Sequence, residues 1–276
     1  MKKTIKNTAT LFTFFIAVIV SAQELDTIIN VGDYNIHFII KKGKESPIIF
    51  ESGSGNDATI WKDIINPIAK NTNATIIRYD RIGYGKSSIQ PNSTKNTHGI
   101  LANVIALEGG LERLGYKKEL TFVSHSLGGF YTRLFAERNF EKMKQIIFLD
   151  ASLPSFYSKD FMNRMQKIMS PKFLENIKKS NLGLYYELLN INQTVQLMQK
   201  TSLSKSLSVL SLEASKAFNP LKNEDDALRW KQSHKIFTAK SSNRKSIEIN
   251  DSSHYIFKSK PDIVISKISD FYNKSN

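Results

Sequence analysis

Short apolar runs alternate with helical stretches along most of this 276-residue chain. Runs typical of buried strands occupy residues 26–30, 34–41, 47–50, 75–79, 119–123, 145–150, 206–212 and 246–250. Between them, apolar side chains recur at helical spacing around residues 60–68, 99–114, 130–138, 226–239 and 262–273. Continuous apolar strands separated by helices are typical of a parallel sheet that is covered on both faces. The pattern therefore predicts an α/β fold with an eight-stranded, mostly parallel sheet flanked by helices.

Local details follow from the same pattern. The first two strands are joined across Gly32-Asp33, which predicts a hairpin at an antiparallel edge of the sheet. In the stretch 99–114 the residues expected to face the sheet are Leu101, Val104, Leu107, Leu111 and Leu114. In the closing stretch 262–273 they are Ile263, Val264, Ile268 and Phe271.

Residues 153–204 interrupt the alternation of strands and helices. They carry no strand pattern and are rich in Met, Phe, Leu and Lys, so they are expected to be helical and irregular. We expect them to form a helical lid inserted after the sixth strand. Its large apolar side chains either line an acyl pocket, where methionines adapt to varied shapes, or pack on the sheet: Phe156, Phe161, Met162, Met165, Ile168 and Met169.

The beginning of the chain has the pattern of an export signal. Three lysines within the first six residues precede an apolar segment, residues 9–20, and small residues follow at 20–22. We expect a signal peptide at residues 1–22 and a single domain at residues 23–276, located in the periplasm or secreted. The apolar segment is shorter than the about 20 residues that a spanning helix needs, so no stable membrane span is expected after cleavage.

Composition narrows the classes of partner. The chain has no cysteine, which removes disulfides and thiolate metal sites. Its formal net charge is +14, but the basic residues are scattered and form no stripe interleaved with aromatic residues. Nucleic-acid binding is therefore not expected. Nothing in the sequence requires a metal ion or an organic cofactor, and we expect none.

The segment 124–129, Ser-His-Ser-Leu-Gly-Gly, follows an apolar strand and precedes a helix. A strand, a sharp turn and a helix are the context in which a nucleophile elbow exposes its serine, here Ser126. Glycines at 128 and 129 allow the helix and strand to pack closely behind the turn. The usual pattern is G-x-S-x-G, and Ser124 stands in place of its first glycine.

Four further motifs accompany the elbow in the order found in α/β-hydrolase fold enzymes. They are Ser-Gly-Ser-Gly at 52–55 with Trp61, Asp-Arg-Ile-Gly-Tyr-Gly-Lys-Ser at 80–87, Ile-Phe-Leu-Asp-Ala at 147–151, and Ser-His at 253–254 with Pro261. The chain thus resembles the esterases and proline-iminopeptidase-like enzymes of that superfamily, from about residue 34 to residue 272 and most weakly across the lid. The resemblance implies acyl transfer to water by a serine, an acid and a histidine, without fixing the substrate.

A base must lie within hydrogen-bond reach of Ser126, because a serine hydroxyl is unreactive at its free pKa. His254 follows the last strand in a serine-rich loop, where the family places its base. The other histidines are expected elsewhere: in an early strand (His37), at a helix start (His98), in the elbow but pointing away (His125), and in an exposed helix (His234).

Two positions compete for the acid. The family most often takes it from the loop after the penultimate strand, where Glu213 is the nearest carboxylate. The alternative, one strand earlier, is Asp150, and the order Ser126, Asp150, His254 agrees with the hydrolase arrangement. Asp150 is the favoured prediction, with Glu213 second and Asp225, Asp226 or no acid after it.

The resemblance also assigns an oxyanion hole. Two backbone N–H groups must meet the negative charge that develops on the substrate oxygen. Leu127, directly after the nucleophile, would supply one, and by family position Ser54 would supply the other. Asp80 and Arg81 are interpreted as stabilising the fold beside the site.

The sequence therefore predicts an exported serine hydrolase that cleaves a small ester, thioester or amide through an acyl-enzyme on Ser126. An aminopeptidase is the first alternative, with Glu108, Glu213 or the run 224–226 available to hold a substrate amine. A lyase or a cofactor-free haloperoxidase could use the same residues. A catalytically inactive binding protein is the remaining hypothesis, supported by Ser124 and by the lack of an aspartate after the penultimate strand.

Overall fold

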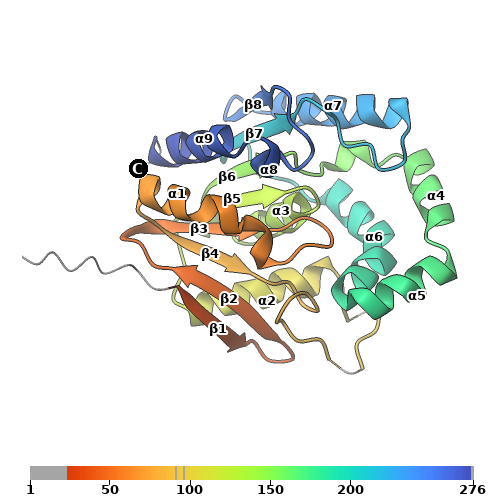
Figure 1. Cartoon of the computed structure of the whole chain (residues 1–276), viewed down its shortest axis with the longest axis horizontal. Coiled ribbons are helices and arrows are strands. Elements are labelled where there is room, and N and C mark those ends of the chain that lie inside the picture. Colours follow the sequence, from red (N-terminus) through yellow and green to blue (C-terminus); the bar gives the residue numbers. More distant parts are fainter. Residues whose placement is uncertain (1–23, 91, 96, 275–276) are drawn as a thin grey trace, which may run out of the picture.

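One central sheet organises the molecule. The computed structural model describes residues 24–90, 92–95 and 97–274, so the predicted signal peptide at 1–22 lies outside the described residues. The strands that the structure describes are β1 (Leu25–Asn30), β2 (Asn35–Lys41), β3 (Glu45–Glu51), β4 (Ala74–Tyr79), β5 (Leu120–His125), β6 (Met143–Leu149), β7 (Ser208–Ala214) and β8 (Arg244–Ile249). They form one eight-stranded sheet in the order β1-β2-β4-β3-β5-β6-β7-β8 (Figure 1).

Strand directions agree with the prediction. β1 pairs with β2 and β2 pairs with β4 in the antiparallel sense, and every pairing from β4 through β3 to β8 is parallel. The hairpin at the edge and the mostly parallel sheet are thereby confirmed. Since the carboxyl ends of the parallel strands meet at one edge, the loops that follow β3, β5, β6 and β8 lie near one another.

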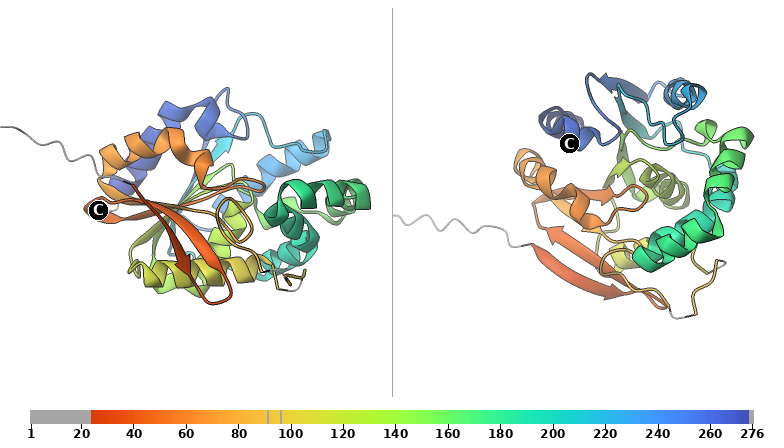
Figure 2. Two further views of the ribbon diagram at one scale, coloured as in Figure 1. Left: turned by 60° about the horizontal axis from the view of Figure 1, so that its bottom comes forward. Right: turned by 45° about the vertical axis from the view of Figure 1, so that its right-hand side comes forward.

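Helices cover both faces of the sheet (Figure 2). The main helices outside the inserted segment are α1 (Lys62–Thr72), α2 (Ile100–Arg113), α3 (Gly128–Arg138), α7 (Glu224–Thr238) and α9 (Pro261–Asn273), with the short α8 (Ile256–Ser259) before α9. α1, α8 and α9 pack on one face, and α2, α3 and α7 pack on the other. Alternate residues of β6 serve the two layers, because Ile147 and Leu149 face the first and Ile146 and Phe148 face the second. Strands buried on both sides are apolar throughout for this reason.

The segment that the sequence predicts to be a lid, residues 153–204 and called the lid segment below, is mostly helical and lies between β6 and β7. It consists of a 3-10 turn at Pro154–Phe156 and of α4 (Lys159–Ile168), α5 (Pro171–Ser180) and α6 (Leu182–Lys200). Figure 1 shows α4, α5 and α6 beyond the carboxyl ends of the central strands. α6 also packs into the main core through Ile191, Val195 and Met198, whereas α5 has no buried residue. One part of the segment, α6, therefore belongs to the hydrophobic core, whereas α5 lies on the surface.

Two expected core positions are wrong. Leu101 and Ile263 are 44% and 43% exposed, respectively. In α2 the buried stripe begins one residue earlier, at Ile100, and in α9 it begins one residue later, at Val264, and continues to Tyr272. One residue corresponds to about 100° around a helix, so each expected leucine or isoleucine falls outside its stripe. Among the described residues, no helix combines the length and apolar character needed to span a membrane.

Candidate active site

Ser126 occupies a sharp turn between β5 and α3. Its φ is +50°, a left-handed conformation that is uncommon for residues other than glycine. Two backbone hydrogen bonds tie the turn to the end of β6 and the loop after it: the Ser126 N–H donates to the Leu149 carbonyl at 3.4 Å, and the Ser152 N–H donates to the Ser126 carbonyl at 2.7 Å. A strained backbone that is held by its surroundings in this way is the geometry of a nucleophile elbow.

Close packing behind the turn requires the two glycines, as predicted. A Cβ at Gly128 would lie 2.6 Å from the carbonyl oxygens of Glu51 and Ser52, and one at Gly129 would lie 2.8 Å from the Cβ of Ala151. Ser124 fits where the usual motif has glycine. It is fully buried, and its hydroxyl lies 2.5 Å from that of Thr132 in α3. A small hydroxyl residue is tolerated there because the helix supplies its partner.

The structure brings Ser126, His254 and Asp150 together. His254 Nε2 lies 2.9 Å from Ser126 Oγ, and His254 Nδ1 lies 2.7 Å from Asp150 Oδ2. All three follow the carboxyl ends of strands: Ser126 follows β5, Asp150 follows β6, and His254 lies in the loop after β8. The serine is 8% exposed and the aspartate is fully buried. Three side chains that follow three separate strands are thus linked by hydrogen bonds.

Asp150 is held on both sides of its carboxylate. Its Oδ1 accepts hydrogen bonds from Trp230 Nε1 at 3.0 Å and from the Ala214 N–H at 3.1 Å, which leaves Oδ2 for His254. Sequence reasoning missed Trp230, because the indole comes from α7, eighty residues away in sequence. Both oxygens of this buried carboxylate therefore have hydrogen-bond partners, as buried polar groups require.

The other carboxylates considered for the acid have other partners. The Glu213 side chain accepts a hydrogen bond from Ser246, and burial raises its pKa. Asp226 is paired with Arg164 at 2.7 Å, and that ion pair lowers its pKa. Asp225 faces solvent.

Aromatic rings fix the orientation of His254. Phe218 lies against its imidazole with ring centroids 4.3 Å apart, and Trp230 meets it edge-on at 5.7 Å. On the other side, His125 lies 4.6 Å away, and its Nε2 is 3.0 Å from the His254 carbonyl oxygen. Burial, together with the nearby His254, lowers the pKa of His125 well below its usual value. A neutral His125 Nε2–H can therefore donate to that carbonyl and hold the loop that carries His254.

The expectation for His234 is wrong. This histidine is 1% exposed rather than on a solvent-facing helix surface, because the α7 face that carries it packs on the sheet. Its Nδ1 lies 3.1 Å from Ser211 Oγ, and its Nε2 lies 3.9 Å from Asp150 Oδ1. Burial lowers its pKa to about 4, so the ring is neutral at pH 7.

The loop after β3 faces Ser126. Ser54 and Leu127 line the same cavity as Ser126, and neither of their N–H groups donates to another group in the part of the chain that the structure describes. Gly53 makes the closest approach: a Cβ there would lie 2.8 Å from His125 Nδ1 and 3.1 Å from Ser126 Cβ. The two amides predicted for an oxyanion hole thus have no partner among the described residues, and both residues line the cavity that Ser126 lines.

Arg81 holds the loop after β3 in place. It is buried, it lies over the rings of Tyr84 and Tyr131 at 4.8 and 4.5 Å, and it donates to the carbonyl oxygens of Ser52 and Gly53 at 2.5 and 2.9 Å. A guanidinium can make several such bonds at once because its donors form a rigid fork. The structural role expected for Arg81 therefore includes positioning the loop beside Ser126.

Glu187 of α6 completes the anchor, and sequence reasoning missed it. One of its carboxylate oxygens accepts from the Ser54 hydroxyl, and the other accepts from Arg81 at 3.1 Å and Tyr131 at 3.2 Å. Its side chain is 5% exposed. The lid segment is thereby tied directly to the loop after β3. No local motif marks Glu187, since its partners are all distant in sequence.

An apolar cavity of about 120 Å³ lies next to Ser126. Its walls include residues from the lid segment and from the loop after β7: Tyr157, Phe161, Met162, Met165, Leu188, Ile191, Phe218 and Pro220. The remaining apolar residues predicted for this role have other environments: Phe156 is buried against Trp230, Met169 packs against the main core, and Ile168 is exposed. An apolar cavity of about 150 Å³ is known to hold benzene, so this one fits a group of a few carbons.

Known proteins are similar to this chain in sequence or in structure. The uncharacterized protein YqjL of Bacillus subtilis (strain 168) is 26% identical over 227 residues, covering 82% of this chain and 83% of its own length. An esterase, EaEST from Exiguobacterium antarcticum, superposes with a TM-score of 0.68 at 13% identity, over 90% of this chain and 100% of that chain. The epoxide hydrolase CorEH superposes with a TM-score of 0.67 at 15% identity, over 92% of this chain and 100% of that chain. At these identities the two structures show the fold alone.

The sequence profile of the alpha/beta hydrolase fold family matches residues 46–265. This range extends from β3 into α9 and contains the three hydrogen-bonded residues and the loop after β3. The chain therefore belongs to the alpha/beta hydrolase fold family.

Proposed function

We propose that the protein is an exported serine hydrolase that cleaves a small ester, thioester or amide through an acyl-enzyme on Ser126. The observation that supports this most strongly is the hydrogen-bonded chain from Ser126 Oγ to His254 Nε2 and from His254 Nδ1 to Asp150 Oδ2. Export rests on the lysines and the short apolar segment at the start of the sequence.

Proton transfer in this mechanism passes through His254. As Ser126 Oγ attacks the substrate carbonyl carbon, His254 Nε2 accepts the hydroxyl proton, and it then donates that proton to the leaving group. Asp150 accepts the Nδ1–H, which fixes the tautomer and stabilises the imidazolium. Water then attacks the acyl-enzyme with His254 as base again, which releases the acid and restores Ser126.

Negative charge develops on the carbonyl oxygen in both tetrahedral intermediates. The free amides of Ser54 and Leu127 are the donors for that oxygen, because both line the cavity beside Ser126. Donors that are already oriented need no reorganisation during the reaction, which makes such stabilisation a large part of catalysis. Arg81 and Glu187 support it by holding the loop that carries Ser54.

The apolar cavity favours an acyl group over a charged amine. An aminopeptidase needs a carboxylate at the cavity to bind the substrate amine, yet neither Glu108, nor Glu213, nor any residue of the run 224–226 lines it. Glu187 reaches the cavity but already accepts from Arg81. Esters and thioesters are therefore the preferred substrates in this proposal, and the lid segment selects among them.

Hydrolysis of p-nitrophenyl esters of increasing acyl length tests this assignment. We expect kcat/KM to be highest for acyl chains of two to about four carbons and at least about tenfold lower for octanoate, because one methylene that does not fit costs about 1–3 kcal/mol. Leu188→Ala enlarges the cavity and should shift the preference towards longer chains. Leu228→Ala is the matched control, since Leu228 is 58% exposed and outside the cavity.

Two results would contradict the assignment. A flat chain-length profile, unchanged by Leu188→Ala, would show that this cavity does not hold the acyl group. Hydrolysis of amino-acid p-nitroanilides with no ester turnover would favour the aminopeptidase instead.

A further inference from the structure

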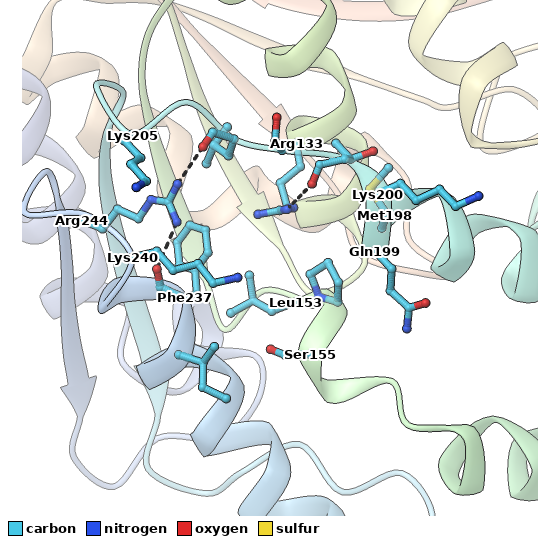
Figure 3. Close-up of a pocket in the computed structure, with 15 residues that line it drawn as sticks. Arg133, Leu153, Ser155, Met198, Gln199, Lys200, Lys205, Phe237, Lys240 and Arg244 are labelled. Atoms are coloured by element: carbon cyan, nitrogen blue, oxygen red, sulfur yellow. Dashed lines mark hydrogen bonds between the residues drawn. The ribbon is translucent and has the colours of Figure 1, made fainter.

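A second cavity, of about 340 Å³, lies apart from the active site (Figure 3). It is bounded by α3, the carboxyl ends of α6 and α7, and the start of β8, and it shares no lining residue with the cavity beside Ser126. Five basic side chains line it, and none of its lining residues is acidic: Arg133, Lys200, Lys205, Lys240 and Arg244. Its volume falls at the lower end of the range for small-molecule sites, about 300–1,000 Å³.

Two arginines of this cavity, Arg133 and Arg244, are buried and held in fixed positions. Both side chains are within the protein, since Arg133 and Arg244 are each 7% exposed. Arg133 donates to the Thr201 carbonyl at 3.0 Å, and Arg244 donates to the carbonyls of Phe237 at 3.1 Å and Leu203 at 2.8 Å. Each guanidinium has five N–H donors, and the Nε of each is buried without a partner in the described residues. Hydrogen-bonding capacity therefore remains on both.

Capping of helix ends does not account for this much positive charge. The carboxyl ends of α6 and α7 together supply about one negative elementary charge. The nearby acid is Glu137, which accepts from the Ser202 N–H at 2.7 Å. This negative charge is smaller than the positive charge of the five basic side chains. Burial and, to a smaller extent, the neighbouring Arg244 lower the pKa of Arg133 to about 10.

Apolar surface lies beside the charges. Phe237 packs under Arg244, with the guanidinium carbon 4.4 Å from the ring centroid, and Leu153, Met198 and Ile236 complete the wall. Figure 3 shows the charged ends of Arg133, Arg244, Lys205 and Lys240 around one hollow, whereas Lys200 points away from it. A ligand that fits this surface has an anionic head and an apolar body.

We propose that this cavity binds an organic phosphate or sulfate monoester, with the anionic head between Arg133 and Arg244 and the apolar body on Phe237. Planar guanidinium groups match the geometry of these oxyanions, and such charge-assisted hydrogen bonds are stronger than neutral ones. The exposed ammonium groups of Lys205 and Lys240 add attraction at the entrance. The site does not depend on the chemistry proposed for Ser126.

Calorimetric titration of the mature chain with phenyl phosphate tests the site. Phenol is the neutral control, and vesicles of phosphatidylcholine with and without phosphatidic acid form a second arm. We expect phenyl phosphate to bind and phenol not to bind. The double variant Lys205→Gln, Lys240→Gln should weaken binding by about tenfold, because two exposed positive charges near the anionic head are lost, while ester hydrolysis stays unchanged. Both lysines are exposed, so we expect their replacement to leave the fold intact.

The matched control is Lys62→Gln, Lys70→Gln, which removes the same charge from exposed positions on α1, across the sheet. It should bind like the wild type. Binding of phenyl phosphate alone would identify a free monoester as the ligand source, and binding only to phosphatidic acid vesicles, lost in the Lys205/Lys240 variant, would identify a lipid head group. Failure of both arms, or equal weakening by the two double variants, would overturn the proposal.

Discussion

Replacing Asp150 with asparagine is expected to lower kcat by about 10⁴-fold without unfolding the protein. Trp230 Nε1 and the Ala214 N–H both donate to Oδ1, so the amide oxygen of asparagine will occupy that position. Its NH₂ group then faces His254 Nδ1, where the carboxylate Oδ2 now lies 2.7 Å away. The amide donates to Nδ1 and forces the proton onto Nε2. In that tautomer His254 cannot accept the proton of Ser126.

Steady-state hydrolysis of a short p-nitrophenyl ester, together with thermal unfolding, measures this effect. Glu213→Gln is the matched control, because Glu213 is the other carboxylate considered for the acid, and here it bonds to Ser246. It should retain most of the activity. Near-normal turnover in Asp150→Asn together with loss of activity in Glu213→Gln would transfer the role to Glu213.

The second large effect is expected at Gly53. A methyl group there would lie 2.8 Å from His125 Nδ1 and 3.1 Å from Ser126 Cβ. His125 cannot easily move, because it is buried and its Nε2 is hydrogen-bonded to the His254 carbonyl at 3.0 Å. The loop must shift instead and carry the Ser54 N–H away from the substrate oxygen. Loss of one such donor lowers kcat by about 10²–10³-fold.

Comparison of Gly53→Ala with Gly109→Ala isolates this steric effect. A Cβ at Gly109 in α2 would meet Val31 at 3.5 Å, which is an ordinary contact, and alanine favours a helix interior. Gly109→Ala should therefore keep wild-type kcat. A Gly53→Ala enzyme with unchanged kcat would mean that the loop after β3 does not supply an oxyanion donor.

Much of the site could be predicted because it follows strand ends. Ser126 and Asp150 each come directly after a buried apolar strand, and His254 lies in the loop after β8. The carboxyl ends of parallel strands meet at one edge of a sheet, which brings the three together. The family resemblance then assigned the roles of nucleophile, acid and base to these three residues. The glycines behind the elbow could be predicted for a similar reason, since close approach of a helix to a strand leaves no room for a Cβ.

The supporting residues could not be predicted, since each depends on distant contacts. Trp230 and Glu187 lie in α7 and α6, and nothing in their local sequence indicates that they reach Asp150 or the loop after β3. The sequence predicts an exposed helix around His234, but the face of α7 that carries this histidine packs on the sheet. Leu101 and Ile263 show that a shift of one residue in a helical stripe exchanges buried and exposed positions.

The measurement that tests the central claim most directly is reaction of the folded protein, expressed without residues 1–22, with a fluorophosphonate, followed by mass mapping of the modified peptide. Only a serine activated by a neighbouring base reacts readily with such a probe. We predict modification of Ser126, much slower labelling of the His254→Gln variant, and none at this position in Ser126→Ala. A well-folded protein that takes up no label at Ser126 would contradict the account and make a catalytically inactive binding protein the better description.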